Sequence, residues 1–400
     1  MICELENVTP FIIKSGQKIS ILELFEEEDM LYRIDTDSFS EQLSVEKIKE
    51  QSELFVEFVK AKTNAVRNNS GSDGKGQMSE NYSKIWEKIQ NYNKENGASK
   101  FKILPGIEKG EDFNNYIEFD DYINIVKIDK NKKQIIPYIP GSTVKGFIRR
   151  MLLLELIKIE SSRTNGREIN LDTYERYRNY DYNQDFASKS SRDLNELMKC
   201  IQVSDFYPAE GVKTKMNTVK RDPQGNKVVL PLVVSGKFYG ELNFLCEEKL
   251  NKWVDQILSS LKLTGSKKDK ENKLFEIIVR NSMIIIEENQ KKYKDKYDIG
   301  NESGRDLIAM GFGKGLSLSG FASLKGKYNL RLPKIMTMGK GWRNKSKWVE
   351  QDYPTTNWAV YFYNGRSLMK NKLGIFKIKN LGDGYIKDIE QLKYILGGND

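Results

Sequence analysis

Residues 139–150 read IPGSTVKGFIRR and open the clearest helix pattern in the chain. The apolar residues of this stretch, and of its continuation to Ile159, recur with the helical period, so we expect one buried face. Ser142 or Thr143 comes directly after the turn at Pro140-Gly141 and is predicted to cap the first helical turn.

Cations lie near the start of this helix, on a face other than the apolar one. Lys145 and Arg149 stand four residues apart, and Arg150 adjoins them. Free backbone amides and the helix dipole already favour an anion at a helix N-terminus, so these cations destabilise the helix unless an anion lies between them. A phosphate group would remove that conflict, and Gly146 would let the backbone of a ligand come close. An ordinary amphipathic helix with exposed basic residues and a packing glycine explains the pattern equally well.

The charge of the chain is unevenly distributed. The 400 residues hold 65 Lys and Arg against 56 Asp and Glu, which gives a net charge of +9. Residues 1–60 contain 6 basic and 14 acidic side chains, whereas residues 307–349 contain nine basic side chains and no acidic one. Because the later stretch also holds many glycines and aromatic rings, it is typical of a surface for single-stranded nucleic acid. A solvated lysine-rich surface is the alternative interpretation.

The composition excludes several classes of protein. The chain has no histidine, which removes histidine-dependent catalytic triads, zinc fingers and every ribonuclease that uses imidazole as acid or base. Its three cysteines lie too far apart for a CxxC pair, which favours a reducing compartment, and we expect the cytoplasm. No apolar run approaches the ~20 residues of a membrane-spanning helix, and no complete nucleotide-binding P-loop occurs.

Strands and helices intermix along the chain, which predicts an α+β fold with a boundary near residue 200. We expect a hairpin-like start, in which strands at 11–13 and 30–35 flank a turn at 14–17. The other predicted helices cover about 45–61, a segment around residues 85–89, 248–263, 271–292 and 385–396, with a polar break at 68–76. The other predicted strands cover 116–119, 123–128, 135–139, 201–205, 358–363 and 375–379, and residues 214–227 are interpreted as a basic loop at the tip of a hairpin.

The segment 139–150 resembles the I-P-G-S-S-L-K-G-x-x-R signature of the repeat-associated mysterious protein (RAMP) superfamily of CRISPR systems. Weaker segments, in the same order along nearly the full length, resemble the fifth-subunit family of the type III-A Csm complex. They are Thr9-Pro10 with Lys14-Ser15-Gly16, Val203-Ser204-Asp205, the glycine-rich loop at 310–315, and Leu373-Gly374-Ile375-Phe376-Lys377. Lys14 and Phe376 depart from the family pattern.

This resemblance implies a fold of two ferredoxin-like (RRM-like) units. The first unit would span 1–200 with a helical insertion at about 41–112, and the second would span 201–400 with the glycine-rich basic loop. It also implies a non-catalytic subunit that binds guide RNA (crRNA), caps the 3′ end of the effector backbone and supports guide maturation in antiviral defence. Expected partners are the 3′ part of the guide, the backbone RAMP subunit, the small helical subunit and nucleases that trim the guide. Neither a membrane, a cofactor nor a metal is expected.

By the same resemblance, two groups of residues would line the path of the guide. They are Gly141, Ser142, Thr143, Lys145, Gly146, Arg149 and Arg150 at the helix start, and Gly311, Gly313, Lys314 and Gly315 in the glycine-rich loop. We expect the acidic first sixty residues to face protein neighbours instead of RNA.

The competing hypothesis is a metal-dependent RAMP ribonuclease, either a backbone subunit that cuts target RNA or a guide processor. Asp35 or Asp37 would then be catalytic, and carboxylates would have to converge around a metal. Further acids stand at Glu118, at Asp120-Asp121 and at Asp383. Neighbouring acids on a strand point to opposite faces, so we interpret Asp120-Asp121 as a solvated turn. An RNA-binding protein unrelated to CRISPR is a third hypothesis.

Overall fold

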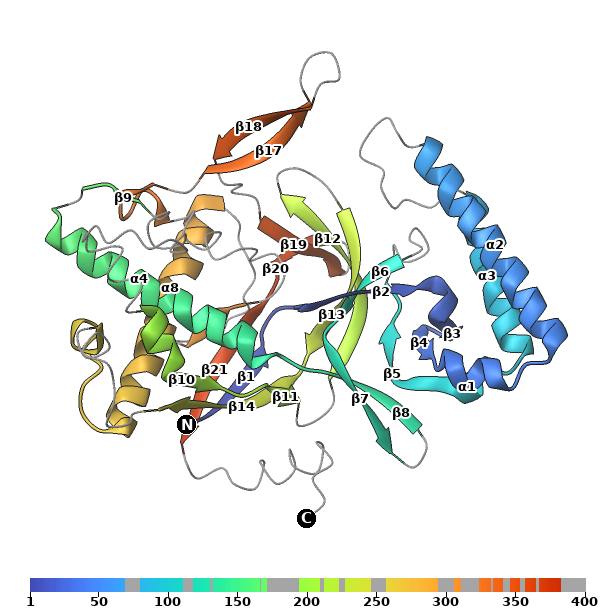
Figure 1. Cartoon of the computed structure of the whole chain (residues 1–400), viewed down its shortest axis with the longest axis horizontal. Coiled ribbons are helices and arrows are strands. Elements are labelled where there is room, and N and C mark those ends of the chain that lie inside the picture. Colours follow the sequence, from blue (N-terminus) through green and yellow to red (C-terminus); the bar gives the residue numbers. More distant parts are fainter. Residues whose placement is uncertain are drawn as a thin grey trace.

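The computed structural model is a mixed assembly of sheets and helices, as the sequence predicts (Figure 1). It describes residues 1–68, 80–110, 118–129, 132–165, 167–170, 194–208, 212–222, 227–245, 257–293, 306–310, 324–331, 334–340, 346–352, 357–364 and 367–382. Helices α4 (Gly141–Arg163) and α8 (Lys267–Tyr293) cover one side, and α2 (Val45–Asn68) and α3 (Glu80–Glu95) lie on the other, with the sheets between them.

The first sheet combines strands from both ends of the chain. Its order is β10 (Ile201–Val203), β14 (Lys237–Phe244), β1 (Ile2–Asn7), β21 (Ile375–Gly382) and β15 (Leu307–Ala309), and all neighbours are antiparallel. The short β11 (Tyr207–Pro208) also pairs with β14. Leaving out β11, β15 and the elements of the other sheets, the chain passes through β1, α4, β10, β14, α8 and β21 in this order. This β-α-β-β-α-β order, with β1 between β14 and β21, is typical of a ferredoxin-like unit.

Helices α4 and α8 bury their apolar faces against this sheet and against each other. The predicted helical period of α4 is confirmed, because Val144, Phe147 and Ile148 are buried and residues 151–154 are buried on every side. Under the helices, the ring of Phe11 lies 5.5 Å from that of Phe238 and 4.7 Å from that of Phe376. Burial of such aromatic rings supplies a large part of the free energy that holds a core together.

The second sheet carries the helical pair α2 and α3. Its order is β20 (Ser367–Lys372), β19 (Asn357–Asn364), β12 (Lys213–Asp222), β5 (Lys102–Glu108), β4 (Met30–Ile34) and β3 (Leu24–Glu27). Three further strands extend it: β13 (Lys227–Ser235) pairs with β12, β8 (Lys132–Pro137) with β5, and β7 (Asn124–Asp129) with β8. From α3, Ile85, Trp86 and Ile89 are buried against this sheet, which confirms the predicted second helix.

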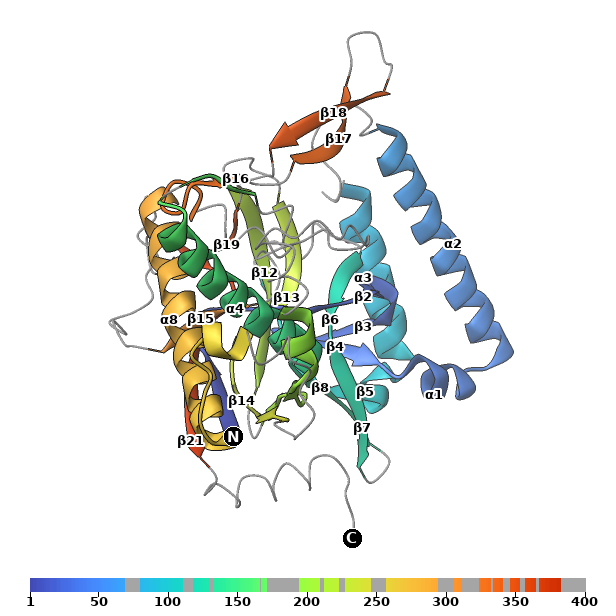
Figure 2. The ribbon, with the colours of Figure 1, turned by 60° about the vertical axis from the view of Figure 1, so that its left-hand side comes forward.

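The remaining described elements are short. They are β2 (Lys14–Ser20) paired with β6 (Glu118–Tyr122), β9 (Ile169–Asn170) paired with β16 (Leu330–Arg331), the hairpin β17 (Lys334–Lys340) and β18 (Ser346–Asp352), helix α1 (Thr36–Glu41), and the 3-10 turns Ile21–Glu23 and Ala98–Phe101. The β17–β18 hairpin projects from the body of the molecule (Figures 1 and 2). In the described part of the chain, no helix is long and apolar enough to cross a membrane.

Two predictions about strands are wrong. The expected turn at 14–17 belongs to β2, which pairs with β6 about a hundred residues later, and the hairpin near the start joins β3 to β4. The expected basic loop at 214–227 is mostly β12, whose Met216 and Val219 are fully buried. In β12 pairing with distant strands overrides a polar local sequence, since strand formation depends on cross-strand neighbours. In β2 only Lys14 of the predicted turn pairs with β6, and residues 15–17 form an irregularity before the pairing resumes at Lys18. The predicted terminal helix at 385–396 lies outside the described residues.

Candidate nucleic-acid interface

The start of α4 is fixed by a carboxylate from a distant part of the chain. The backbone N–H of Gly141 donates to Oδ1 of Asp205 at 2.7 Å, and the hydroxyl of Tyr207 donates to Oδ2 of the same residue at 3.3 Å. Pro140 is the residue that precedes the first helical turn, so the predicted cap at Ser142 or Thr143 is wrong. The helix begins one residue before Ser142, and the anion that stabilises its N-terminus comes from the Val203-Ser204-Asp205 segment.

Glycine is required at position 141 because the helix start lies against the backbone after β10. A Cβ atom there would lie 2.4 Å from the carbonyl oxygen of Val203 and 2.6 Å from that of Ser204. Two backbone hydrogen bonds between Ile139 and Phe206, of 2.9 and 2.8 Å, hold the two segments side by side. The two sequence motifs therefore form one structural unit.

This unit leaves one face of the first α4 turns uncovered. Ser142 and Gly146 are exposed, and Thr143, Lys145, Arg149 and Arg150 are half-buried. Among the described residues Lys145 makes no ion pair or hydrogen bond, and Arg149 contacts only the side-chain oxygen of Asn195, at 3.3 and 3.4 Å. A Cβ atom on Gly146 would meet nothing within 4 Å, so the packing-glycine interpretation is wrong for the described part of the chain. The face can accept an anion without any rearrangement of carboxylates.

Part of the predicted electrostatic conflict is resolved within the protein. Asp205 supplies a negative charge at the first amide of α4, where the helix dipole favours it. Burial, together with the neighbouring carboxylate of Asp205, raises the pKa of Tyr207, so this hydroxyl stays a donor to the carboxylate. The ring of Tyr207 stacks on that of Tyr138 with centroids 5.5 Å apart, which stiffens the loop beside the helix start.

The second group of predicted residues lies outside the described chain. Gly311, Gly313, Lys314 and Gly315 follow Met310, whose N–H donates to the carbonyl oxygen of Gly374 at 2.8 Å. Met310 directly follows β15, and the α4 start lies beside β10. These two strands lie at opposite edges of the first sheet, with β14, β1 and β21 between them. That one guide RNA contacts both groups stays a prediction.

The sheet face opposite the helices offers no open aromatic platform in the described residues. Phe238 and Leu242 point into the helix-side core, so Tyr239 points to the other face. Its hydroxyl donates to Glu4 at 2.8 Å, and Glu4 also binds the ammonium group of Lys379 at 2.8 Å. RRM modules stack bases on exposed sheet aromatics. Here Tyr239 is 9% exposed and bound to a carboxylate, and Tyr207, which lies opposite it on β11, is half-buried, stacked on Tyr138 and bound to Asp205. This leaves the α4 start as the better surface.

The acids of the competing hypothesis are held by cations. Asp35 accepts from Lys133 at 2.7 Å and from Ser38 at 2.8 Å; burial raises the pKa of Asp35, but these two donors outweigh it and lower the pKa overall. Asp37 lies in the first turn of α1. Asp120 pairs with Lys14, and Asp121 pairs with Arg33.

The solvated-turn interpretation of Asp120-Asp121 is wrong. Both residues lie in β6, and Asp121 is only 3% exposed. A buried carboxylate needs a charged partner, which Arg33 supplies. Asp383 and the side chain of Glu118 lie outside what the structure describes, and among the described residues no three acids or cysteines are grouped so that they could hold a metal ion.

Some of the acids in the first sixty residues pair with lysines from later segments. Glu26 pairs with Lys109 at 2.6 Å, and Glu27 pairs with Lys102. Because these pairs join β3 to β5 and to the residue after it, this part of the negative charge serves the fold. That the segment faces protein neighbours stays a prediction.

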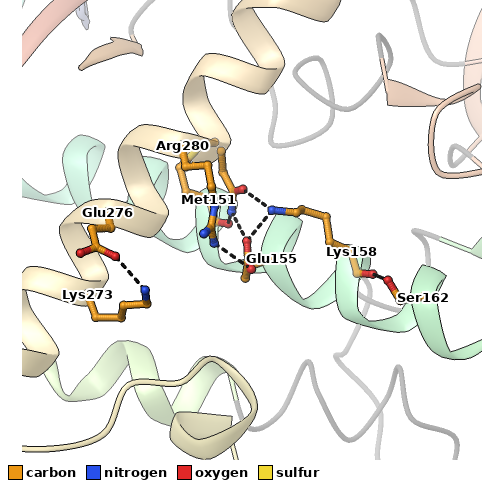
Figure 3. A network of polar contacts seen from close by, with 8 residues as sticks. Met151, Glu155, Lys158, Ser162, Lys273, Glu276 and Arg280 are labelled. Atoms are coloured by element: carbon orange, nitrogen blue, oxygen red, sulfur yellow. Dashed lines mark hydrogen bonds and ion pairs between the residues drawn. The ribbon is translucent and has the colours of Figure 1, made fainter. Parts of the chain in front are cut away.

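The second half of α4 contains a half-buried charge network (Figure 3). Glu155 on α4 binds Lys158 and, on α8, Arg280, each at 2.9 Å. Asn281, fully buried on α8, donates to the carbonyl oxygen of Met151 at 2.8 Å and to Glu155 at 3.0 Å. Burial raises the pKa of Glu155, but these three donors outweigh it and hold the pKa below its ordinary value. The network fixes α4 against α8 and thereby orients the helix start.

Comparison with known proteins gives a fold likeness. No family model and no curated protein matches the sequence. A chain from the cryo-EM structure of a Csm-crRNA-target RNA ternary complex of a type III-A CRISPR-Cas system matches with a TM-score of 0.53 and 16% identity, over 95% of this chain and 100% of that one. The crystal structure of T. onnurineus Csm5 matches with a TM-score of 0.46 and 17% identity, over 81% of this chain and 94% of that one. The resemblance predicted from the motifs is thus confirmed at the level of the fold, which this chain shares with a chain of a type III-A Csm complex.

Proposed function

We propose that this chain is a non-catalytic subunit of a type III CRISPR effector that binds the 3′ part of the guide RNA. The observation that carries the proposal is the uncovered face of α4, where Lys145, Gly146 and Arg149 lie together without a carboxylate partner in the described chain. In this role the subunit caps one end of the effector backbone and supports guide maturation.

The chemistry of that face suits a sugar-phosphate chain. Lys145 and Arg149 lie about one helical turn apart, so each can take a phosphate oxygen of the same strand. Gly146 between them leaves open space in which the ribose-phosphate backbone can approach the helix. The exposed hydroxyl of Ser142 adds a neutral donor. Contacts of this kind position an RNA without reading its sequence.

The fold supports the same role. The matched chain comes from a complex that contains crRNA and target RNA, and the likeness extends over 95% of this chain. We propose as partners the guide RNA, the backbone RAMP subunit, the small helical subunit and nucleases that trim the guide. The loop with Gly311, Gly313, Lys314 and Gly315 is proposed as a second contact with the guide.

The division into two ferredoxin-like units, 1–200 and 201–400, is part of the proposal. The β-α-β-β-α-β order around the first sheet supports one such unit. Because its strands come from both sides of residue 200, it supports the presence of the unit and not a boundary at that residue. The second sheet, with its helical pair α2 and α3, would then belong to the other unit.

The non-catalytic character is supported by the pairing of the acids. Asp35, Asp120 and Asp121 each bind a lysine or arginine, so their charge is already compensated without a metal. A cleavage assay with magnesium and a matched target RNA tests this point. We expect no cleavage by the purified chain, and cleavage that disappears in Asp35→Ala would establish the ribonuclease instead.

The RNA-binding surface is tested with the double variant Lys145→Ala/Arg149→Ala. Guide RNA binding is measured over a range of salt concentrations, for the purified chain and for the particle. We expect weaker binding, a slope of log affinity against log salt that falls by about two, and altered guide length in the particle.

The matched control is Lys88→Ala/Lys291→Ala, which removes the same charge from exposed lysines that pair with Glu57 and Glu288. If both double variants change affinity and slope equally, only net charge matters and the assigned surface is wrong. An unchanged slope in the α4 variant would also refute it.

A further inference from the structure

Apolar side chains gather on the outer face of α2, away from the proposed RNA surface. Of the large apolar side chains exposed in the described chain, five lie on this helix: Val45, Ile48, Phe55, Val56 and Val59, with exposed fractions of 84, 42, 51, 48 and 40%. We name these residues the α2 stripe. Contiguous exposed apolar residues of this kind mark an interaction site in a folded protein.

The fold itself does not use the α2 stripe. Other residues of α2 hold the helix in place: Phe58 is 3% exposed, Glu57 binds Lys88 of α3 at 2.7 Å, and Tyr92 of α3 donates to the carbonyl oxygen of Lys47 at 2.7 Å. Helix α3 lies between α2 and the sheets (Figure 2). The exposed fractions of the stripe residues put them on the solvent side of α2.

The spacing of the stripe identifies the shape of its occupant. Val45, Ile48, Ser52, Phe55 and Val59 follow one another at intervals of three, four, three and four residues. This interval pattern is that of the a and d positions in a two-stranded coiled coil. Ser52 at the centre donates its hydroxyl to the carbonyl oxygen of Ile48 at 2.9 Å, so it brings no unpaired donor into the seam. The matching occupant is a second helix with the same repeat.

The charges beside the stripe select among possible occupants. Lys49 and Lys60 border it on one side and have no carboxylate partner among the described residues, and Gln51 borders it on the other. A second copy of α2 would bring no acid to these lysines, because it presents the same border. Residues 45–60 contain four glutamates and three lysines, so this part of the helix has a net negative charge and does not attract RNA. An acidic border on a different protein complements the lysines.

We propose that the α2 stripe is a docking surface for an amphipathic helix of a different protein. That helix carries apolar residues at a 3.5-residue repeat and acidic residues beside its seam, where they meet Lys49 and Lys60. This inference is independent of the RNA surface on α4, which lies on the other side of the sheets.

The test uses the full chain and a labelled helical peptide of about four heptads, with Val and Leu in its seam and Glu beside it. A second peptide has Lys in place of those Glu residues. Fluorescence anisotropy measures binding of both peptides to the wild-type chain, to Phe55→Asp and to Val126→Asp. Val126 is the matched control, since it is an apolar residue on β7 with 56% exposure. Circular dichroism confirms that each variant is folded.

We expect the Glu-bordered peptide to bind the wild-type chain and Val126→Asp equally, and Phe55→Asp at least about tenfold more weakly. The variant Lys49→Glu/Lys60→Glu should prefer the Lys-bordered peptide. Absence of binding, or equal loss in Phe55→Asp and Val126→Asp, overturns the proposal. Sedimentation that shows a dimer, dissociated by Phe55→Asp, assigns the stripe to a second copy and overturns it too. Because none of these readouts involves RNA, failure here leaves the RNA proposal untouched.

Discussion

In the first half of α4, Lys145 and Arg149 have no carboxylate partner among the described residues, whereas in the second half Glu155 binds Lys158 and Arg280 at 2.9 Å. The two halves belong to one helix, and Lys145, Arg149, Glu155 and Lys158 are all half-buried, so the difference does not follow from burial alone. The carboxylate of Glu155 is compensated by cations of its own helix and of α8. Lys145 and Arg149 at the helix start have no carboxylate partner among the described residues, so they can bind the phosphate groups of a flexible chain.

The same contrast holds for the two glycines of the first turns. A Cβ atom on Gly141 would collide with backbone atoms of the segment after β10, whereas a Cβ atom on Gly146, five residues later, would meet nothing within 4 Å. One glycine therefore serves the structure and the other leaves room outside it. Substitutions at these positions and in the charge network test whether the two halves of α4 serve different ends.

The largest expected effect belongs to Gly141→Ala. The new methyl group would lie 2.4 Å from the carbonyl oxygen of Val203, a backbone atom that cannot rotate away. We expect a loss of about 3 kcal/mol in the free energy of unfolding, measured by urea denaturation. A loss below about 1 kcal/mol would show that the contact with the β10 segment relaxes, and that the helix start is not held as described.

The next effect belongs to Glu155→Gln, which keeps the shape of the side chain and removes its charge. At neutral pH we expect the variant to be about 2 kcal/mol less stable, because Lys158 and Arg280 lose their charged acceptor. The control Glu276→Gln breaks a surface pair with Lys273 and should change stability by less than about 0.5 kcal/mol (Figure 3).

Acidity supplies a second readout for Glu155. Its pKa in the folded protein lies below the ordinary value of 4.5, so its carboxylate stabilises the fold above that value. This contribution is lost as the pH falls through the folded-state pKa. The stability difference between wild type and Glu155→Gln should therefore shrink below about pH 4.5. A difference that stays constant down to acid pH would mean that charge is not what the network contributes.

The smallest effect on stability, with opposite sign, belongs to Gly146→Ala. Alanine favours a helix over glycine by up to about 1 kcal/mol, and nothing lies within 4 Å of the added carbon. We expect a slightly higher urea midpoint together with weaker guide RNA binding, because the methyl group occupies the approach to the helix. A lower midpoint would instead reveal a packing role for Gly146.

The helix could be predicted from the sequence, because its pattern is local. The period of Val144, Phe147 and Ile148 identifies the buried face of α4, and the polar break near residue 70 separates two helices that the structure confirms on either side. Local signals of this kind depend on neighbours three or four residues away. The cap of α4 could not be predicted, since Asp205 reaches it from the segment after β10, 64 residues later.

Strand pairing was the harder part to predict. The polar stretch Lys14-Ser15-Gly16-Gln17 reads as a turn, yet it lies within β2, where Lys14 pairs with Tyr122 of β6 and residues 15–17 form an irregularity before the pairing resumes at Lys18. The basic stretch of β12 reads as a loop although Met216 and Val219 are buried. Both depend on partners far along the chain, which composition does not reveal. Of the candidate site, the open face of α4 follows from the sequence, whereas the position of the glycine-rich loop stays a prediction.

The central place of β1 has a consequence for biosynthesis. Its neighbours β14 and β21 follow it by more than two hundred residues, and β21 is the last described strand. A nascent chain leaving the ribosome therefore carries β1 without β14 until residue 244 has been made, and without β21 until residue 382 has been made. The side chains of Cys3 and Leu5, which are buried in the folded protein, stay available to chaperones until these neighbours arrive. Completion of this sheet is thus tied to the synthesis of residues 375–382, and a chain that stops before them lacks one of the two neighbours of β1.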